Sequence, residues 1–389
     1  MPDKLSVGII IPNDFVKRLP FGGGSGFIQN IINVVTYNVV IFGSGANGSE
    51  LWQEIHLNEK TIFQATYPIR YPSSLPLRIY ALFGYISNRN RILDSDVDLL
   101  YIHSPECALP FLFGRKRKPV VFHQHGSGNP VSTATYPWAR NSLFRWIFDT
   151  IHKIIYRRSD WIIVIDRLCQ NQATKYGCRR KSSLLMNAVD SSQFYPNEKV
   201  RTRMRSTYNL SENETVILFV GRLEELKQVD RVIQSLSFLD SAVKARLLIA
   251  GTGSQRVALE ELAVQAGVAD KVIFLEKIPH NELPLYYNMA DLLALPSKME
   301  GVPMVILEAL SCGKPVLATA VGGIPDLITS GTNGMLIPEA SASQIAKSIE
   351  SISKRSWDTD TICNSVSTWR SEAVAEALLS IFGNLLKKQ

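Results

Sequence analysis

Short runs of aliphatic and β-branched residues alternate along the chain with longer stretches of mixed polarity. Runs spaced in this way predict strands of parallel sheets covered by helices, an α/β fold. In the first half the predicted strands are SVGIIIP, NVVIFGS, DLLYIHS, PVVFHQHG and WIIVIDR, beginning at residues 6, 38, 98, 119 and 161. In the second half they are TVILFVG, ARLLIAG, KVIFLEK, DLLALPS, KPVLATA and GMLIPE, beginning at residues 215, 245, 271, 291, 314 and 334.

A polar stretch separates the two sets of strands. Residues 187–214, NAVDSSQFYPNEKVRTRMRSTYNLSENE, contain Pro196 and show no apolar periodicity. This pattern predicts a linker, with a domain boundary near residue 195. A chain of 389 residues has room for two such domains. Because ligands of parallel sheets bind at the carboxyl ends of the strands, candidate functional residues are sought there.

The composition is that of a soluble globular protein, with 46% hydrophobic and 20% charged residues. No apolar run reaches the ~18–20 residues that span a bilayer. The start, MPDKLSVGIIIP, lacks the basic segment and long apolar core of a secretory signal. The cysteines are odd in number and form no closely spaced pairs, so we expect reduced thiols and a cytoplasmic protein. They are Cys107, Cys169, Cys178, Cys312 and Cys363.

Charge is distributed unevenly. Residues 1–200 hold 23 Lys and Arg against 14 Asp and Glu, or +9, whereas residues 201–389 hold 19 against 21, or −2, which together give the net +7. A basic first half indicates an anionic partner, for which nucleic acid and an anionic membrane surface are both open. Residues 135–161 mix Trp138 and Trp146 with arginines, as an interfacial helix does, although a helix packed on the sheet explains the apolar residues equally.

Chemical signals concentrate after the strands of the second half. In FVGRLEELKQVDRVI, Arg222 and Lys227 follow a strand, and a planar guanidinium beside a compact ammonium suits a diphosphate. The alternative is a pair of surface cations matched to neighbouring glutamates. In LLIAGTGSQ, Gly253 closes a Gly-Thr-Gly turn, which a plain tight turn explains as well.

The stretch PSKMEGVPMVILEALSCGKPVLATAVGGIPDLI, from Pro296, places two acids around a helix start. Pro303 suits the first helical position, which would leave the amides of residues 301–305 available to an anion. A carboxylate at Glu308 can accept two adjacent hydroxyls of a sugar or ribose. The helix dipole alone would explain Glu300 but not a second acid inside an apolar helix.

Taken in order, these motifs resemble the retaining GT-B glycosyltransferases of family 4. The resemblance covers most of residues 185–340, and Glu300 and Glu308 match the family's paired glutamates with seven residues between them. It is weaker in the first half, in PFGGGSGF, DLLYIHSP, FHQHG and NAVD. The family implies two facing Rossmann-like domains with an interdomain cleft. Residues 1–195 would bind the acceptor, residues 196–365 the nucleotide-sugar, and residues 366–389 would return as a helix to the first domain.

The resemblance also implies roles for matching residues. Arg222 and Lys227 would hold the donor diphosphate, and Glu308 the nucleotide ribose. Glu300 and His125 would contact the transferred sugar and, with the two cations, form the catalytic set. Gly23 and Gly24, in a loop after the first strand, would let the backbone approach phosphates or acceptor closely. The full expected donor-binding set is Arg222, Lys227, Gly253, Ile278, Glu300, Gly301, Val302, Pro303, Met304 and Glu308.

Some positions depart from the family pattern or are discounted. Gln228 and Ala188 stand where glycines are usual, and Ile165-Asp166 replaces a common Val-Ser, which leaves the acceptor more open. The acids of DSDVD, residues 94–98, resemble a metal-binding Asp-x-Asp but are expected to form a solvated loop. We expect no catalytic metal and no cofactor, and His123 is expected to be an ordinary strand histidine.

The resemblance implies a metal-independent retaining hexosyl or N-acetylhexosaminyl transferase. Its donor would be a nucleotide-sugar, UDP-linked rather than GDP-linked, and its acceptor a saccharide, expected to be lipid-linked, in surface polysaccharide or glycan assembly. We expect it at the cytoplasmic face of an anionic membrane, without nucleic acid. Alternatives are a family member that only binds nucleotide-sugars and a nicotinamide-dependent oxidoreductase, although FGGGSGF lacks the spacing of that fingerprint. A nucleic-acid-binding protein would fit the pI of 9.1 but shows no recognition motif.

Overall fold

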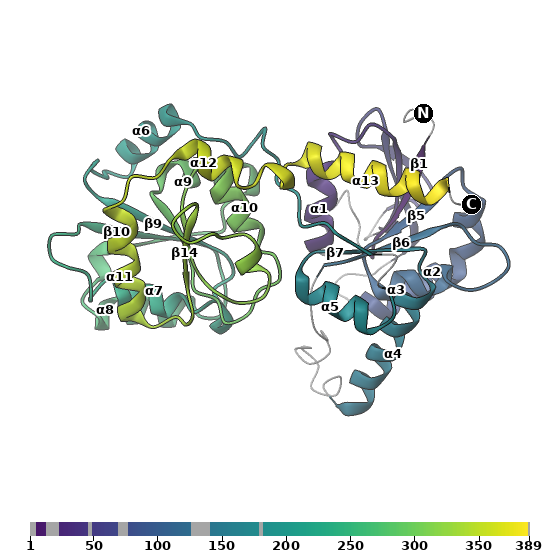
Figure 1. Cartoon of the computed structure of the whole chain (residues 1–389), viewed down its shortest axis with the longest axis horizontal. Helices are drawn as coiled ribbons and strands as arrows, with labels where there is room; N and C mark the ends of the chain where they lie inside the picture. The colour runs from purple at the N-terminus through teal and green to yellow at the C-terminus, as the bar shows by residue number, and fades with distance from the viewer. Residues whose placement is uncertain are drawn as a thin grey trace. The chain divides into compact units, whose positions relative to one another are not determined.

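The computed structural model describes residues 5–12, 23–45, 49–68, 77–125, 141–178 and 182–387. They divide into two compact units (Figure 1): unit 1 is residues 1–188 with 371–389, and unit 2 is residues 189–370. Each unit contains one extended sheet whose strands alternate with helices along the chain, so the predicted α/β class is confirmed. In the described segments, no helix is both long and apolar enough to cross a membrane.

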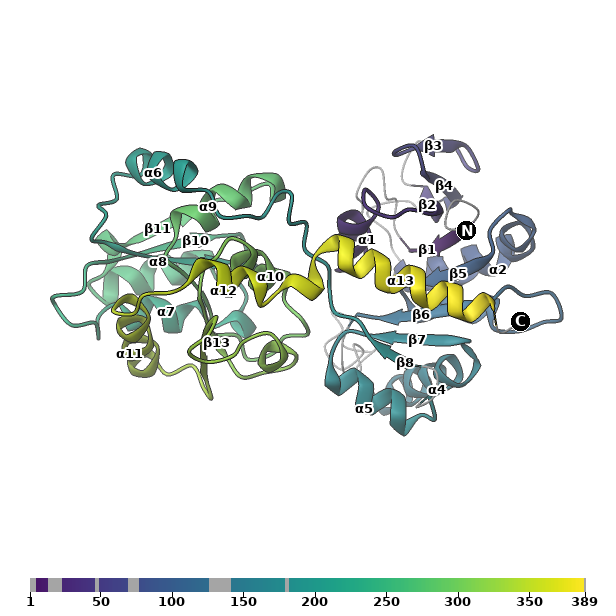
Figure 2. The same cartoon turned by 45° about the horizontal axis from the view of Figure 1, so that its top comes forward.

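Unit 1 is built on an eight-stranded sheet in the order β3-β4-β2-β1-β5-β6-β7-β8, which can be followed from top to bottom in Figure 2. All neighbouring strands are parallel except β3, which pairs antiparallel with β4. The strands are β1 (Ser6–Ile10), β2 (Asn38–Gly45), β3 (Glu54–His56), β4 (Thr61–Pro68), β5 (Leu99–Ile102), β6 (Val120–Gln124), β7 (Trp161–Val164) and β8 (Ser182–Leu184).

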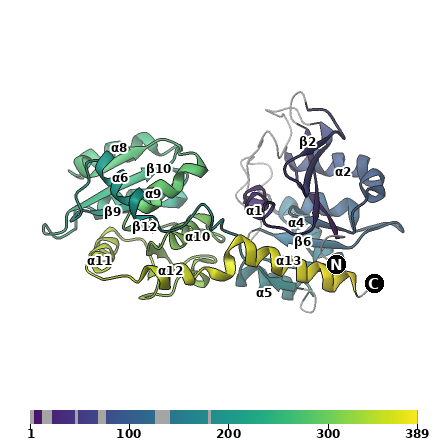
Figure 3. The same ribbon diagram turned by 90° about the horizontal axis from the view of Figure 1, so that it is seen from above.

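The last helix of the chain packs within unit 1. Its residues Phe382 and Leu378 are fully buried, and the Phe382 ring meets the rings of Tyr37 and Tyr101 edge-on. Figure 3 shows this helix, α13, alongside α1. The helices of unit 1 are α1 (Gly23–Ile31), α2 (Leu77–Asp94), α3 (Pro105–Ala108), η2 (Leu109–Phe111), α4 (Ser142–Arg158), α5 (Arg167–Lys175) and α13 (Ser371–Leu386).

Every strand predicted from the hydrophobic pattern is present, but β3, β4 and β8 were not predicted. β3 and β8 are only three residues long and bury none of their side chains fully, so they carry no apolar run. β4 is longer, but Gln64 and Thr66 interrupt its apolar residues. β3 and β8 are the two edge strands of this sheet.

Unit 2 has a six-stranded, wholly parallel sheet in the order β11-β10-β9-β12-β13-β14. Counted from β9, this is the 3-2-1-4-5-6 order of dinucleotide-binding folds, and the order reverses between β9 and β12. The strands are β9 (Thr215–Val220), β10 (Ala245–Ala250), β11 (Val272–Leu275), β12 (Leu292–Leu295), β13 (Val316–Thr319) and β14 (Gly334–Ile337).

Helices cover both faces of this sheet. In Figure 1, α7, α8 and α11 lie on one face, and α6, α9, α10 and α12 lie on the other. The longer helical segments are α6 (Glu198–Thr207), α7 (Val229–Ser235), α8 (Arg256–Gln265), α9 (Leu283–Met289), α10 (Met304–Ser311), α11 (Ala342–Ser353) and α12 (Thr359–Asn364). The short turns are η5 (Glu225–Lys227), η6 (Ala269–Lys271), η7 (His280–Glu282), η8 (Ile324–Asp326) and η9 (Ser367–Trp369).

Residues 187–214, predicted to be a linker, contain a helix, α6, that belongs to unit 2. Asn197 caps this helix by accepting from the Val200 amide at 3.1 Å. Its buried Arg205 donates to an Asp291 carboxylate oxygen at 3.2 Å. The helix therefore docks through a buried cation rather than an apolar stripe, so the hydrophobic pattern did not predict it.

The chain passes from unit 1 to unit 2 between residues 188 and 189 and returns between residues 370 and 371, not at 195 and 365 as expected. The Val189 amide donates to the Trp369 carbonyl at 2.9 Å, and the Tyr195 carbonyl accepts from Asn288 at 3.0 Å. These bonds hold residues 189–195 and the end of the second domain within unit 2. Composition placed the boundary next to Pro196, whereas these hydrogen bonds place residues 189–195 in unit 2, so that the boundary lies before residue 189.

Backbone-to-backbone packing positions the loops at the carboxyl ends of the strands in unit 2. A Cβ on Gly251 would lie 1.9 Å from the Gly221 carbonyl oxygen, and one on Gly253 would lie 2.3 Å from the Leu223 carbonyl oxygen. The Leu223 amide also donates to the Thr252 carbonyl at 2.9 Å. The loops after β9 and β10 are therefore in direct contact, which requires glycine rather than merely permitting it.

The loop after β13 packs in the same way against the loop after β12. Gly322 has a φ of +58°, and a Cβ there would lie 1.8 Å from the Glu300 carbonyl oxygen. Next to it, the Gly323 amide donates to the Gly301 carbonyl at 2.8 Å. The loop after β13 therefore packs directly against the main chain of Glu300 and Gly301.

We predict that Gly322→Ala destabilises the protein more than Gly267→Ala. Gly267 has a similar φ of +66° but no atom within 4 Å of a built Cβ, so its substitution costs only the left-handed backbone, about 1–2 kcal/mol. Gly322→Ala adds a backbone clash, for which a further 1–3 kcal/mol is typical of overpacking. Urea unfolding followed by circular dichroism measures both, and equal losses would show that the loop relaxes without cost.

Candidate functional site

The expected donor residues gather where the strand order of unit 2 reverses. Arg222 follows β9 and Glu300 follows β12, and these two strands are neighbours in the sheet. Crevices outside the carboxyl ends of strands at such a reversal are where ligands of doubly wound sheets bind. Arg222 is exposed there. The location that the sequence motifs indicated is therefore a geometrically favoured ligand position.

Lys227 and Glu300 are in direct contact. Lys227 Nζ donates to Glu300 Oε1 at 2.6 Å, and the Ser297 hydroxyl donates to the same oxygen at 2.6 Å. Their side chains are 21% and 10% exposed, so both are largely withdrawn from water but reachable. The cation expected at a diphosphate and the acid expected at a sugar thus lie side by side, although 73 residues separate them in sequence.

Glu308 is nearly fully buried, with 2% of its side chain exposed. The Tyr287 hydroxyl donates to Oε2 at 2.7 Å, and His280 Nε2 lies 2.8 Å from Oε1. Burial and the adjacent carboxylate raise the pKa of Tyr287 well above its ordinary value, so this hydroxyl keeps its proton and donates. A buried carboxylate needs such partners, because burial without them is costly. Two of its lone-pair positions remain for a ligand.

The start of α10 differs by one position from the sequence prediction. Pro303 is the N-cap residue with extended backbone, and Met304 is the first helical residue. No side chain caps this N-terminus in the described structure. Gly301 and Met304 are half-buried and Val302 is buried. The segment still places a helix N-terminus directly after Glu300, where an anion is favoured.

The remaining expected donor residues lie on neighbouring loops. Gly253 is held against Leu223 beside the Arg222 loop. Ile278 is half-buried between β11 and η7, two residues before His280. His280, Tyr287 and Ser297 were not predicted as site residues. His280 and Tyr287 contact Glu308 only through the fold, and no spacing motif in a single sequence signals such contacts. Ser297 lies three residues before Glu300 in the motif stretch itself, but its residue type gave no signal of the contact.

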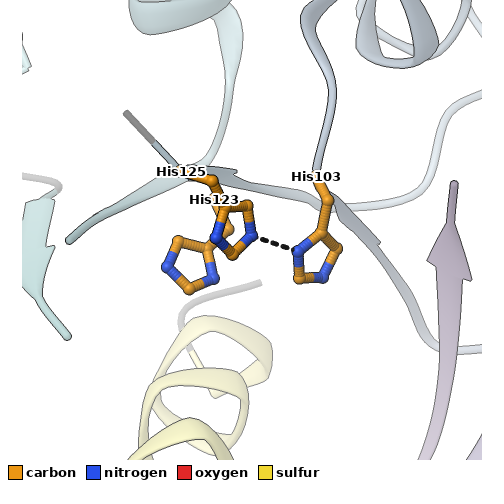
Figure 4. A group of neighbouring side chains, drawn as sticks. All are labelled: His103, His123 and His125. Atoms are coloured by element: carbon orange, nitrogen blue, oxygen red, sulfur yellow. Dashed lines mark hydrogen bonds between the residues drawn. The ribbon is translucent and has the colours of Figure 1, made fainter. Parts of the chain in front are cut away.

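In unit 1, three histidines stand at the carboxyl ends of β5 and β6 (Figure 4). His103 Nδ1 lies 2.6 Å from His125 Nε2, and the Tyr101 hydroxyl lies 2.6 Å from His123 Nδ1. His103 and His123 are buried and His125 is half-buried. His125, expected to face the sugar, is thus tied by Nε2 to a neighbouring ring, and His123 is bonded within the core.

Burial makes these imidazoles hard to protonate. It lowers the pKa of His125 to about 4, and it lowers the pKa values of His103 and His123 well below the ordinary value, assisted by their mutual repulsion. All three rings are therefore neutral at pH 7. The result is a neutral cluster with one hydrogen bond between His103 and His125 and a separate one between His123 and Tyr101.

The three histidines are also the group in the described part of the chain whose chemistry suits a metal ion. Their candidate ligand nitrogens all lie within 4.8 Å of one another. Zinc binds nitrogen at about 2.0–2.1 Å, so two nitrogens on one ion lie at most about 4.2 Å apart. The His123 ring packs against Phe27 and the His103 ring against Tyr101, which restricts how these rings can turn toward a shared ion. The absence of a catalytic metal stays a prediction.

Gly23 and Gly24 were expected to lie in a loop, but they are the first residues of α1. The preceding residues 13–22 lie outside the described part of the chain, as do Gly126 and Trp138. The two glycines keep a position after β1, beside β5 in the sheet order, so their backbone starts a helix next to the reversal point of unit 1.

We predict that acid destabilises unit 1 through its buried histidines. Their folded-state pKa values lie below the unfolded value of about 6.5, so the stability they contribute is complete above that pH and is lost as the pH falls toward 4. Each histidine contributes a slope of roughly 1 kcal/mol per pH unit in this window. His103→Asn should flatten the dependence of unfolding free energy on pH, while the exposed His56→Asn should not. Parallel curves for wild type and His103→Asn would contradict the assignment.

Comparison with known proteins agrees with the two-unit architecture. Residues 200–364 match the sequence family described as glycosyl transferases group 1, and residues 37–193 match glycosyltransferase family 4. The chain is 27% identical over 344 residues to the GDP-mannose-dependent alpha-(1-6)-phosphatidylinositol monomannoside mannosyltransferase of Mycolicibacterium smegmatis, covering 85% of this chain and 84% of that protein. It is 24% identical over 318 residues to N-acetyl-alpha-D-glucosaminyl L-malate synthase of Bacillus anthracis, covering 76% and 80%.

Among solved structures, sucrose-phosphate synthase from Thermosynechococcus elongatus superimposes with a TM-score of 0.80 at 19% identity, over 99% of this chain and 100% of that one. At this identity the likeness concerns the fold, which is that of the GT-B glycosyltransferases. The two family matches lie side by side along most of the chain, one in each half. The chain belongs to glycosyltransferase family 4 and is a GT-B glycosyltransferase.

Proposed function

We propose that the chain is a retaining glycosyltransferase that moves a hexosyl or N-acetylhexosaminyl group from a nucleotide-sugar to a saccharide acceptor without a metal ion. The observation that carries the proposal is the 2.6 Å contact between Lys227 and Glu300 at the point where the strand order reverses. Lys227, which suits a phosphate, and Glu300, which suits sugar hydroxyls, are joined there by one hydrogen bond. In a nucleotide-sugar, phosphate and sugar are likewise adjacent, because the anomeric carbon of the sugar is bonded to a phosphate oxygen.

During the reaction, negative charge develops on the departing diphosphate. As the bond between anomeric carbon and phosphate oxygen breaks, Arg222, Lys227 and the start of α10 supply donors already in position, which is the most effective form of electrostatic catalysis. Lys227 is paired with Glu300 at 2.6 Å. Glu300 accepts from the sugar's hydroxyls and keeps Lys227 in place for the phosphate.

Retention of configuration needs the acceptor oxygen to attack the face from which the diphosphate leaves. The acceptor's proton passes to the departing phosphate oxygen, so no protein carboxylate has to act as nucleophile. Glu300 is already engaged by Lys227 and Ser297, which fits a binding role. His125 is proposed as the unit 1 contact of the sugar, with its ring orientation fixed by His103.

The donor's nucleotide is a uridine or guanosine diphosphate. The sequence favours UDP, whereas the mycobacterial relative is named as GDP-mannose-dependent. Base recognition is assigned to the loop around Ile278, which follows β11. Main-chain contacts in such a loop can select either base, so the choice between UDP and GDP is decided by measuring donor binding.

A panel of UDP-, GDP- and ADP-sugars, tested by thermal shift, should contain one series that stabilises the wild type. A ligand at about 100 times its dissociation constant adds about 2.7 kcal/mol. Glu308→Ala should lose most of that shift, and the exposed Glu282→Ala should keep it. No shift with any donor, or a full shift in Glu308→Ala, would contradict the donor site.

The acceptor is proposed to be a lipid-linked saccharide at an anionic membrane surface, as in surface polysaccharide or glycan assembly. The relative named for phosphatidylinositol monomannoside supports a lipid acceptor. On α4, Leu143, Trp146 and Ile147 are 57%, 65% and 37% exposed, while Ile155 is buried. The same helix exposes Lys153, Arg157 and Arg158. Exposed apolar side chains with cations on one helix are typical of a helix lying in a membrane interface.

We expect cosedimentation with vesicles that contain anionic lipid and little with neutral vesicles. Trp146→Ala should reduce binding about tenfold, because a buried aromatic ring contributes a large part of interfacial affinity. Phe238→Ala is the matched control, since this ring is 60% exposed but lies in unit 2. Equal binding to neutral vesicles, or equal losses in both variants, would reject docking through α4.

A further inference from the structure

His280 is the half-exposed neighbour of a buried acid. Its side chain is 52% exposed, whereas Glu308, 2.8 Å away, is 2% exposed. Because an ionised carboxylate only accepts hydrogen bonds, His280 Nε2 carries the proton in this contact. His280 is therefore a partly exposed hydrogen-bond donor to a carboxylate that is itself buried.

Three aromatic side chains set the orientation of Glu308. Tyr287 donates to Oε2 from within α9, and His280 donates to Oε1 from the turn before that helix. The buried ring of Phe194 packs against both, with ring centroids 5.2 Å from His280 and 5.9 Å from Tyr287. One donor on each oxygen prevents the carboxylate from turning about its terminal bond.

This arrangement leaves a defined pair of acceptor positions. A carboxylate has about four lone-pair sites, of which His280 and Tyr287 use one on each oxygen. The free site on each oxygen can receive one hydroxyl of an adjacent pair. If the carboxylate turned, the two sites would no longer match two neighbouring hydroxyls at once.

We propose that His280 is a positioning residue for the donor: it holds the Glu308 carboxylate, against Tyr287, in the orientation that accepts both ribose hydroxyls of the nucleotide. The inference rests on the proposed role of Glu308 at the ribose. His280 acts through Glu308 and not on the transferred sugar, so its loss affects donor binding rather than the bond-breaking step.

The test compares His280→Ala, His280→Gln and the neighbouring Asn281→Ala. Asn281 is exposed on the same turn and serves as the control. Glutamine places an amide N–H near the position of Nε2, so it restores the hydrogen bond without the ring. Calorimetry with UDP and GDP gives the dissociation constants, and initial rates of donor hydrolysis give KM and kcat without an acceptor.

His280→Ala should raise the dissociation constant and donor KM about tenfold, as expected for a lost hydrogen bond to a charged group, with kcat within about twofold of wild type. His280→Gln should recover most of this loss, and Asn281→Ala should match wild type. Equal affinity in wild type and His280→Ala, or no recovery in His280→Gln, overturns the inference. Glu308→Ala run alongside separates the two failures: if it also binds normally, the ribose site itself is wrong, and if it binds poorly, only the role of His280 is rejected.

Discussion

The proposed donor site depends on how one residue, Glu300, is held. Its main chain packs against Gly322, where even a methyl group would lie 1.8 Å from the carbonyl oxygen. Its side chain accepts from Lys227 and Ser297 on the same oxygen. Two segments distant in sequence, around Lys227 and Gly322, and the neighbouring Ser297 therefore contact a single residue after β12. A shift of any of them would move the carboxylate relative to the cation beside it.

The two glutamates of the site solve the same electrostatic problem in different ways. Glu300 remains partly hydrated and is balanced by a full positive charge on Lys227. Glu308 is shut away from water and is held by a phenol and an imidazole. A charged partner suits a position beside a diphosphate, because the same cation can contact both the carboxylate and the phosphate. Directional donors such as a phenol and an imidazole suit a position that must keep its geometry when a ligand binds, because hydrogen bonds fix direction more strictly than charge does.

Sequence patterns predicted the parts of this molecule that repeat a local rule. Each strand of unit 2 is a continuous apolar run bounded by turn residues, so all six were found. The paired glutamates and the cations after β9 follow a recognisable spacing, and the fold brings Lys227 and Glu300 into contact, whereas their roles stay predictions. What escaped prediction depends on tertiary contacts: α6 docks through Arg205, β3 and β8 are too short to carry a pattern, and His280 gains its role only by folding next to Glu308.

Gln228 shows how far residue identity can vary while geometry is kept. The family pattern that the sequence resembles has glycine after the lysine, and here Gln228 has a φ of +50° and a ψ of +40°, the left-handed conformation that glycine adopts freely. Its carbonyl accepts from Arg231 at 3.1 Å as α7 begins. A non-glycine residue in this region costs roughly 1–2 kcal/mol. The same residue directly follows Lys227, whose ammonium donates to Glu300 at 2.6 Å, and directly precedes the first residue of α7. Strain at Gln228 is therefore offset by contacts on both sides of the turn.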